Sequence, residues 1–256
     1  GDDELEAPLA AQDDTVAAVI VEPLVQCATG MAMHDPAYLR RVRALCDCFG
    51  VHLIADEIAV GCGRTGTFFA CEQAGIWADF LCLSKGISGG YLPLALVMTR
   101  EAIYQGFVDD DAARSFLHSH SYTGNALACR AALATLDLFE QEDALNRNLS
   151  RSARLLARLR EGLAGQAVDH LRQRGMITAF DVREPGARFA ERFHLAARDH
   201  GLLMRPIGAT VYLMPPYAIA NHEIDQLVDG TLATLQAVTH ASGARADEGA
   251  RDAALA

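Results

Sequence analysis

The sequence predicts an α/β protein, with a mostly parallel sheet in the first part of the chain and a small α+β domain after it. Two observations carry this prediction. Short apolar runs alternate with segments of helical spacing through residues 1–140, as strands and helices do in layered α/β domains. Over residues 141–239 the pattern changes to long helices with a few short strands between them, which indicates a second, smaller unit.

Residues 1–140 contain four predicted strands and two predicted helices. The strands are the apolar runs at 16–21, 51–55, 80–83 and 94–98, each bounded by polar or turn-forming residues. One helix is predicted to begin at the cap Asp35, with Pro36 in its first turn, and to end at Gly50. The other covers 125–140, where leucine and alanine recur at helical spacing. Strands that alternate with helices in this way favour a largely parallel sheet.

Residues 141–239 predict a small α+β domain. Its helices are expected at 144–163, 187–200 and 223–238, and its strands at 177–182, 202–205 and 210–213. The first of these helices carries arginines along one face. Residues 240–256 are rich in Ala, Gly, Arg and Asp without apolar periodicity, and we expect this tail to be disordered.

Composition narrows the class of protein. With 51% hydrophobic and 21% charged residues the chain is typical of a globular domain, and its formal charge of −11 opposes binding to nucleic acid or to anionic membranes. No apolar run reaches the roughly 20 residues that span a bilayer, and the acidic start is unlike a signal peptide. We therefore expect a cytoplasmic protein. We expect no metal site, because Cys46-x-Cys48 and His118-x-His120 lack zinc-site spacing.

Three polar side chains follow the ends of predicted strands. Glu22 comes after the strand at 16–21, Asp56 after the strand at 51–55, and Lys85 shortly after the strand at 80–83. In a parallel sheet the carboxyl ends of the strands meet at one edge, where ligands bind. These three residues are therefore predicted to converge on one site.

Lys85 is the one lysine among 22 basic residues; all the others are arginines. Chance can leave a single lysine in an arginine-rich chain. The alternative is chemistry that arginine cannot perform, because a guanidinium stays protonated whereas an amine can deprotonate and form a Schiff base. A glycine-rich turn follows Lys85 and lets the backbone approach a bound group closely.

A lysine and an aspartate at adjacent strand ends suit pyridoxal 5'-phosphate. The lysine amine condenses with the aldehyde of this cofactor, and the carboxylate pairs with its pyridine nitrogen. Asp56 could instead be an ordinary helix cap or turn residue. The residues alone leave both interpretations of Asp56 open.

Two longer motifs carry a family resemblance. Residues 56–66 read DEIAVGCGRTG and residues 83–86 read LSKG, and this pair at this spacing resembles the signature of class III aminotransferases, which have fold type I. The resemblance implies that the chain is the second half of a fold type I large domain with its small carboxyl-terminal domain. It implies that Lys85 carries pyridoxal 5'-phosphate, Asp56 holds its ring nitrogen and Ile58 packs on the ring, while Glu22 and Gln26 support Asp56.

Further motifs resemble one branch of that family. RPIG at 205–208 and YLMPPY at 212–217 are similar to members that transfer an amino group from S-adenosylmethionine to 8-amino-7-oxononanoate in biotin synthesis. By this resemblance Arg205 binds the substrate carboxylate, while Tyr212 and Arg64 shape the same pocket. Other ω-amine transaminases of class III, and a silent fragment of the fold, remain as alternatives.

The segment HSHSYTGN at 118–125 corresponds to the family loop that reaches across a homodimer to the phosphate of the neighbouring cofactor. Ser121 stands where the family usually has threonine, and His120 or Thr123 could share the role. The chain begins in the middle of the family pattern, without the earlier strands and phosphate loop. The resemblance therefore does not predict that this chain is active by itself.

Overall fold

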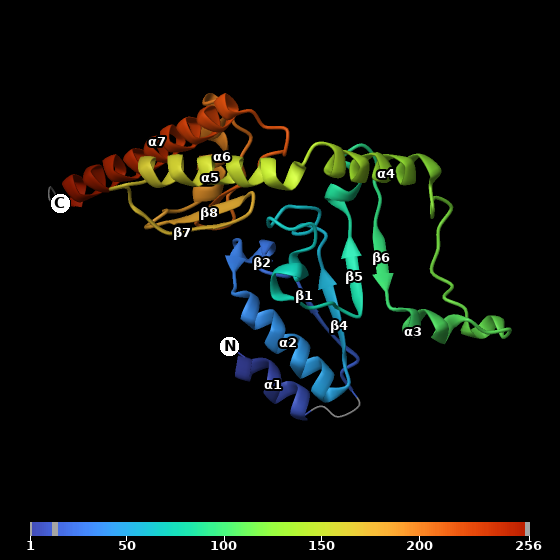
Figure 1. Ribbon diagram of the computed structural model, residues 1–256. Coiled ribbons are helices and arrows are strands. Elements are labelled where there is room, and N and C mark those ends of the chain that lie inside the picture. The colour runs from blue at the N-terminus through green and yellow to red at the C-terminus, as the bar shows by residue number, and fades with distance from the viewer. Residues whose placement is uncertain (1, 12–14, 254–256) are drawn as a thin grey trace. The chain divides into compact units, whose positions relative to one another are not determined.

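The computed structural model describes residues 2–11 and 15–253, and the side chains of residues 5–11 and 15–239. The chain forms two units, coloured by residue number in Figure 1. The first comprises Gly1–Cys27 and Met33–Leu145, and the second comprises Ala28–Ala32 and Asn146–Ala256. The main division therefore lies between residues 145 and 146, close to the expected 140–141. The inclusion of Ala28–Ala32 in the second unit was not predicted.

The first unit is built on a sheet in the order β1-β4-β5-β6. Its strands are Ala18–Val21 (β1), His52–Asp56 (β4), Phe80–Leu83 (β5) and Leu96–Thr99 (β6). The first three are parallel, and β6 runs antiparallel to β5. Figure 1 shows the arrow of β6 pointing opposite to that of β5. The predicted α/β fold with a mostly parallel sheet is confirmed.

Helices flank these strands in the chain. Asp35 caps α2 (Pro36–Phe49), because its side chain accepts a hydrogen bond of 2.7 Å from the Ala37 amide, and Gly50 ends this helix at a φ of 67°. The predicted helix at 125–140 is α4 (Ala126–Gln141). The remaining elements are α1 (Asp2–Ala11), the short strands β2 (Val25–Gln26) and β3 (Ala32–Met33), α3 (Glu101–Tyr104), and 3-10 helices at Cys27–Thr29, Ala70–Ala74, Lys85–Ser88, Gln105–Phe107 and Ala112–Arg114.

The second unit packs helices on a three-stranded antiparallel sheet, in the order β7-β8-β9. Its strands are Val168–Arg174 (β7), Ile177–Val182 (β8) and Thr210–Leu213 (β9), and its helices are α5 (Ala144–Gly162), α6 (Phe189–Asp199) and α7 (Asn221–Ala253). One core joins them, with Leu155 and Leu159 from α5, Phe180 from β8 and Phe193 from α6 fully buried.

Several sequence predictions for this unit need correction. Residues 202–205 are not a strand, since Leu203 is 83% exposed and only β9 of the predicted pair forms. Strand β7 was not predicted, and α7 continues past the expected end at residue 238. The tail expected to be disordered, 240–256, instead continues as helix through Ala253, while its side chains and residues 254–256 lie outside the described part of the chain. Within the described ranges, no helix combines the length and apolarity needed to cross a membrane.

Candidate functional site

The carboxyl ends of β1, β4 and β5 bring the predicted site residues of the first unit to one edge of the sheet. Val21 is level with Ala55, and Asp56 is level with Cys82. Glu22 directly follows β1, Asp56 is the last residue of β4, and Lys85 begins the 3-10 helix after β5. The predicted convergence of three strand ends is therefore present in the structure.

Asp56 is held by the residue that follows it. The Glu57 amide donates a 3.0 Å hydrogen bond to the Cys82 carbonyl, which extends the pairing of β4 with β5. The Glu57 side chain is buried, and its carboxylate accepts hydrogen bonds of 2.7 and 2.8 Å from the amides of Ala70 and Cys71. Successive strand side chains point to opposite faces, so a buried Glu57 directs Asp56 to the other face.

Burial raises the pKa of Glu57, although the hydrogen bonds from Cys71 and Ala70 oppose the rise. This carboxyl group has the perturbed pKa that often marks a functional residue. Its contacts give a structural reason instead, because both oxygens are committed to backbone amides. Glu57 is thus an anchor for the end of β4.

The glycine turn at 61–66 packs against that anchor. A Cβ on Gly61 would lie 2.8 Å from the Glu57 carbonyl oxygen and 2.9 Å from its carboxylate oxygen Oε2. The Gly61 amide also donates to the same carbonyl at 2.9 Å. A side chain at this position would displace Glu57, so the turn must be glycine here. Arg64, in this turn, and Ile58, just before it, are both half-buried.

Lys85 occupies a constrained backbone position. Its φ is 41°, in the left-handed region that a residue with a side chain rarely adopts. The preceding Ser84 hydroxyl donates to the Leu94 carbonyl at 2.7 Å, and a Cβ on the following Gly86 would lie 2.8 Å from the Cys62 Cβ. Packing on both sides therefore fixes the turn, while the Lys85 side chain stays exposed.

The Cys27 thiol lies near several charged groups of this edge. Its pKa is raised to about 11, mainly by burial; the charges of Glu22 and Asp56 contribute to the rise, and those of Lys85 and Arg64 oppose it. Charges act on a thiol strongly only over short distances. The Cys27 amide also donates a 2.7 Å hydrogen bond to Glu22 Oε2.

Cys27 was not among the residues predicted for the site. Its position five residues after Glu22, beyond a proline, gave no signal of a strand end or of a motif. Gln26, which the family resemblance assigned to the support of Asp56, is exposed on β2. Its predicted role stays a prediction.

The loop at 118–125 forms an exposed turn. The His120 amide donates to the Thr123 hydroxyl at 3.0 Å, the Thr123 amide donates to the His120 carbonyl at 2.9 Å, and the Tyr122 amide donates to His120 Nδ1 at 3.1 Å. These hydrogen bonds are internal to the turn. They do not bring His120 or Ser121 to Lys85, so the assignment of both to a cofactor phosphate stays a prediction.

Arg205 and Tyr212 belong to the second unit. Arg205 is exposed in the segment that precedes β9, and Tyr212 is half-buried on β9, where it pairs with Ala179 of β8. Their predicted contact with a substrate carboxylate remains a prediction.

Over most of its length the chain is similar to proteins of one family. The profile described as "Aminotransferase class-III" matches residues 2–235. Two curated relatives, from Nitratidesulfovibrio vulgaris and Helicobacter pylori, are each 46% identical to this chain and carry the name adenosylmethionine-8-amino-7-oxononanoate aminotransferase. The match covers 87% of this chain with both, but 43% of the first relative and 52% of the second. The chain thus spans about half the length of the curated relatives it matches.

Solved structures give the same picture. An adenosylmethionine-8-amino-7-oxononanoate aminotransferase from Methanocaldococcus jannaschii aligns with a TM-score of 0.85 at 31% identity, over 92% of this chain and 57% of that one. An amine transaminase from an uncultivated Pseudomonas species, in a form bound to pyridoxal phosphate, aligns with a TM-score of 0.85 at 32% identity, over 93% and 56%.

Proposed function

This chain belongs to the class-III aminotransferase family, and from this premise we propose that it supplies the lysine-bearing part of a site for pyridoxal 5'-phosphate. The observation that carries the proposal is the convergence of Glu22, Asp56 and Lys85 at the carboxyl ends of the parallel strands β1, β4 and β5. An amine and a carboxylate at adjacent strand ends are the two groups that this cofactor requires. A Cβ on Gly86 would clash with Cys62, so the close packing of this turn holds the backbone that carries Lys85 in place.

These residues fit the cofactor in stated roles. Lys85 would attach it through Nζ, Asp56 would hold a proton on its ring nitrogen, and Ile58 would pack on its ring. Glu22, tied to the Cys27 amide, would support Asp56 from β1. When bound, the cofactor acts as an electron sink for the carbon that loses its proton. Lys85 Nζ would act as the base that takes the proton from the α-carbon of the amino donor.

We further propose that the amino donor is S-adenosylmethionine and the acceptor 8-amino-7-oxononanoate, giving 7,8-diaminononanoate. The names of the sequence relatives support this choice. Arg205 would bind a substrate carboxylate with its planar guanidinium, and Tyr212 and Arg64 would shape the pocket. The amine transaminase from an uncultivated Pseudomonas species aligns equally well as a structure, so an ω-amine donor is the second candidate.

The proposal includes a homodimer. The exposed turn with His120 and Ser121 would reach the cofactor phosphate of a partner subunit, as the family resemblance implies. Because the hydrogen bonds of this turn are internal, its side chains can meet another chain without breaking the first unit. We also propose a cytoplasmic location, which rests on the sequence pattern alone.

The test uses the single lysine. We expect the wild-type chain to show a yellow absorbance band with pyridoxal phosphate, and we expect the band to bleach when S-adenosylmethionine is added. Lys85→Arg should abolish the band and the label that borohydride fixes on the chain. The matched control adds Arg198→Lys to Lys85→Arg, which restores a lysine at an exposed position of α6 but should not restore the band.

A band that survives Lys85→Arg would contradict the role of Lys85. A band that bleaches with an ω-amine but not with S-adenosylmethionine would favour the second candidate. If the wild-type chain shows no band, the same measurements on a fusion with the amino-terminal half of the Nitratidesulfovibrio vulgaris relative decide whether the chain supplies a working part of the site.

A further inference from the structure

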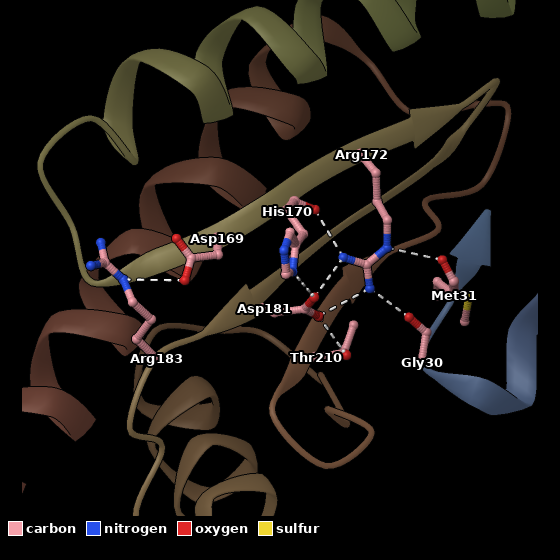
Figure 2. Close-up of polar contacts among 8 residues, drawn as sticks. All are labelled: Gly30, Met31, Asp169, His170, Arg172, Asp181, Arg183 and Thr210. Carbon is pink, nitrogen blue, oxygen red and sulfur yellow. Dashed lines mark hydrogen bonds and ion pairs between the residues drawn. The ribbon is translucent and has the colours of Figure 1, made fainter. Parts of the chain in front are cut away.

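Residues Ala28–Ala32 belong to the second unit, although the chain on both sides of them, at Cys27 and Met33, belongs to the first. We call these five residues the crossing segment. Figure 2 shows what holds it: the guanidinium of Arg172, on β7, lies between the backbone of Gly30 and Met31 and the carboxylate of Asp181.

All three nitrogen atoms of the Arg172 guanidinium donate hydrogen bonds. Nε donates to the Met31 carbonyl at 3.0 Å, and Nη2 donates to the Gly30 carbonyl at 2.6 Å. Nη1 and Nη2 each donate to one oxygen of the Asp181 carboxylate at 3.0 Å, and Nη1 also reaches the His170 carbonyl at 2.8 Å. The side chain of Arg172 is only 19% exposed.

The strand around Arg172 is shaped for this contact. β7 carries a bulge, because Asp169 pairs with Asp181 while Arg172 pairs with Ala179, which leaves one extra residue on β7. Within the bulge His170 has a φ of 53°, and its carbonyl accepts from the guanidinium. A bulge re-aims the residues beside it, and here it belongs to the cluster that surrounds Arg172.

Asp181 is oriented from the other side. The Thr210 hydroxyl donates to Asp181 Oδ1 at 2.7 Å, and His170 Nδ1 lies 3.0 Å from Oδ2. Burial raises the pKa of Asp181, but the hydrogen bonds from Arg172, Thr210 and His170 outweigh it and hold the pKa below its ordinary value. The carboxylate is therefore charged at neutral pH and keeps the guanidinium in place.

Gly30 lets the crossing segment approach the sheet. Its φ is 72°, and a Cβ built on it would lie 2.8 Å from the Thr210 hydroxyl. A side chain at this position would push the segment away from Thr210 and Asp181. The contact thus depends on glycine on one side and on arginine on the other.

We infer that Arg172 is a positioning residue for the proposed cofactor site. By fixing the carbonyls of Gly30 and Met31 to the sheet of the second unit, it sets where the chain leaves Cys27. The Cys27 amide in turn holds Glu22, and its thiol lies among the charges of Lys85 and Asp56. We call Arg172 and its hydrogen bonds to Gly30 and Met31 the clamp. The clamp is linked to the site through the covalent chain, because Gly30 lies three residues after Cys27. The role toward the cofactor rests on the proposed function.

Lysine cannot replace this arginine. One ammonium group cannot donate at once to two adjacent carbonyls and to both oxygens of a carboxylate in a fixed plane. Arg172→Lys therefore keeps the charge but loses the geometry. Asp181→Asn is a second variant, which leaves Arg172 in place and removes the charge that orients it. The matched control is Arg183→Lys, since Arg183 pairs with Asp169 nearby at 3.4 Å and both side chains are largely exposed (Figure 2).

The first measurement is hydrogen exchange of the cofactor-free chain. We expect amides of the crossing segment and of its flanks to exchange about tenfold faster in Arg172→Lys, because charge-assisted hydrogen bonds to the segment are lost. Asp181→Asn should change exchange in the same direction by a smaller factor. Arg183→Lys should leave it unchanged. Unchanged exchange in Arg172→Lys would overturn the clamp.

The second measurement is the dissociation constant of pyridoxal phosphate, taken by absorbance titration well below the unfolding temperature of each variant. A purely structural residue would lower that temperature without changing the affinity of the folded chain. We expect about a tenfold weaker affinity in Arg172→Lys, equivalent to the loss of one charge-assisted hydrogen bond, and none in Arg183→Lys. Faster exchange with unchanged affinity would overturn the positioning role. If the chain binds no cofactor by itself, the titration is made on the fusion with the amino-terminal half of the Nitratidesulfovibrio vulgaris relative. Absence of binding there too would overturn the proposed function and this role with it, while exchange would still decide whether Arg172 holds the crossing segment.

Discussion

The two units differ in how far their large hydrophobic side chains are buried. The second unit encloses them in one core between its sheet and its three helices. Among the described residues, only Leu149, Leu195 and Leu203 of that unit are large hydrophobics with high exposure. In the first unit many such side chains are exposed, including Ile20 (64%) on β1 and Val97 (66%) on β6, the outer strands of its sheet.

The unit with the closed core is therefore not the unit that carries the proposed cofactor lysine. The second unit has a closed core, and its described contacts explain how it holds its shape. The first unit carries Lys85 and Asp56, yet its outer strands have exposed apolar side chains. Such strands tend to associate with other protein chains. Three sets of variants test this difference between the units.

The largest effect on stability is expected in the closed core. Phe180 is fully buried in the second unit, so Phe180→Ala should cost about 3–5 kcal/mol of unfolding free energy through lost burial and a cavity. Urea unfolding followed by circular dichroism measures it. Leu203→Ala, at a position 83% exposed, is the control and should change stability by less than about 0.5 kcal/mol.

The single tryptophan makes that experiment more specific. Trp77 lies in the first unit, so its fluorescence follows that unit while circular dichroism follows both. If the units differ as described, Phe180→Ala shifts the dichroism transition more than the fluorescence transition. An equal shift of both would show that the units unfold together, and the contrast between them would fail.

A smaller effect is expected from a buried carboxylate of the first unit. Asp79 is 1% exposed, and its Oδ2 accepts hydrogen bonds of 2.8 Å from the Leu53 amide and from Arg43, while Arg100 binds the other oxygen. Burial raises its pKa, but these hydrogen bonds and charges outweigh burial and hold the pKa below its ordinary value. Asp79→Asn should therefore cost about 2 kcal/mol at pH 7.

The sign of the pH dependence follows from the lowered pKa. A carboxyl group with a lower pKa in the folded state stabilises the fold above its unfolded pKa, and this contribution is lost as pH falls through the folded value. The difference between wild type and Asp79→Asn should thus narrow below about pH 4. Asp47→Asn, which removes an exposed partner of Arg43, is the control and should have little effect. A constant difference across pH would contradict the prediction.

The sequence predicted the parts of this molecule that depend on local pattern. The strands β4 and β5 contain the apolar runs at 53–55 and 80–83, and Asp35, Pro36 and Gly50 mark the ends of α2 by their own backbone preferences. The meeting of Glu22, Asp56 and Lys85 followed because parallel strands place their carboxyl ends at one edge.

Contacts between distant parts of the chain could not be predicted in this way. β7 reads VDHLRQR, without an apolar run, and it is a strand because it pairs with β8. The sequence of Leu202–Arg205 is apolar like that of a strand, but this segment forms no strand in the sheet, and Leu203 is exposed to solvent. The clamp joins Arg172 to Gly30 across 142 positions of the chain, and nothing near either residue in the sequence announces it.

The smallest effect on stability, and the one that bears most directly on the contrast, is expected at the outer strand β6. Val97→Thr keeps a β-branched side chain at a position 66% exposed, so it should change unfolding free energy by less than about 0.5 kcal/mol. It removes an apolar group from an exposed strand, so self-association of the chain, measured by sedimentation velocity, should decrease. Leu195→Thr, 52% exposed on α6 of the second unit, is the matched control and should leave sedimentation unchanged. A wild-type chain that sediments as a single monomer at high concentration would mean that the exposed apolar side chains of the first unit do not drive pairing, and stability alone would then distinguish the two units.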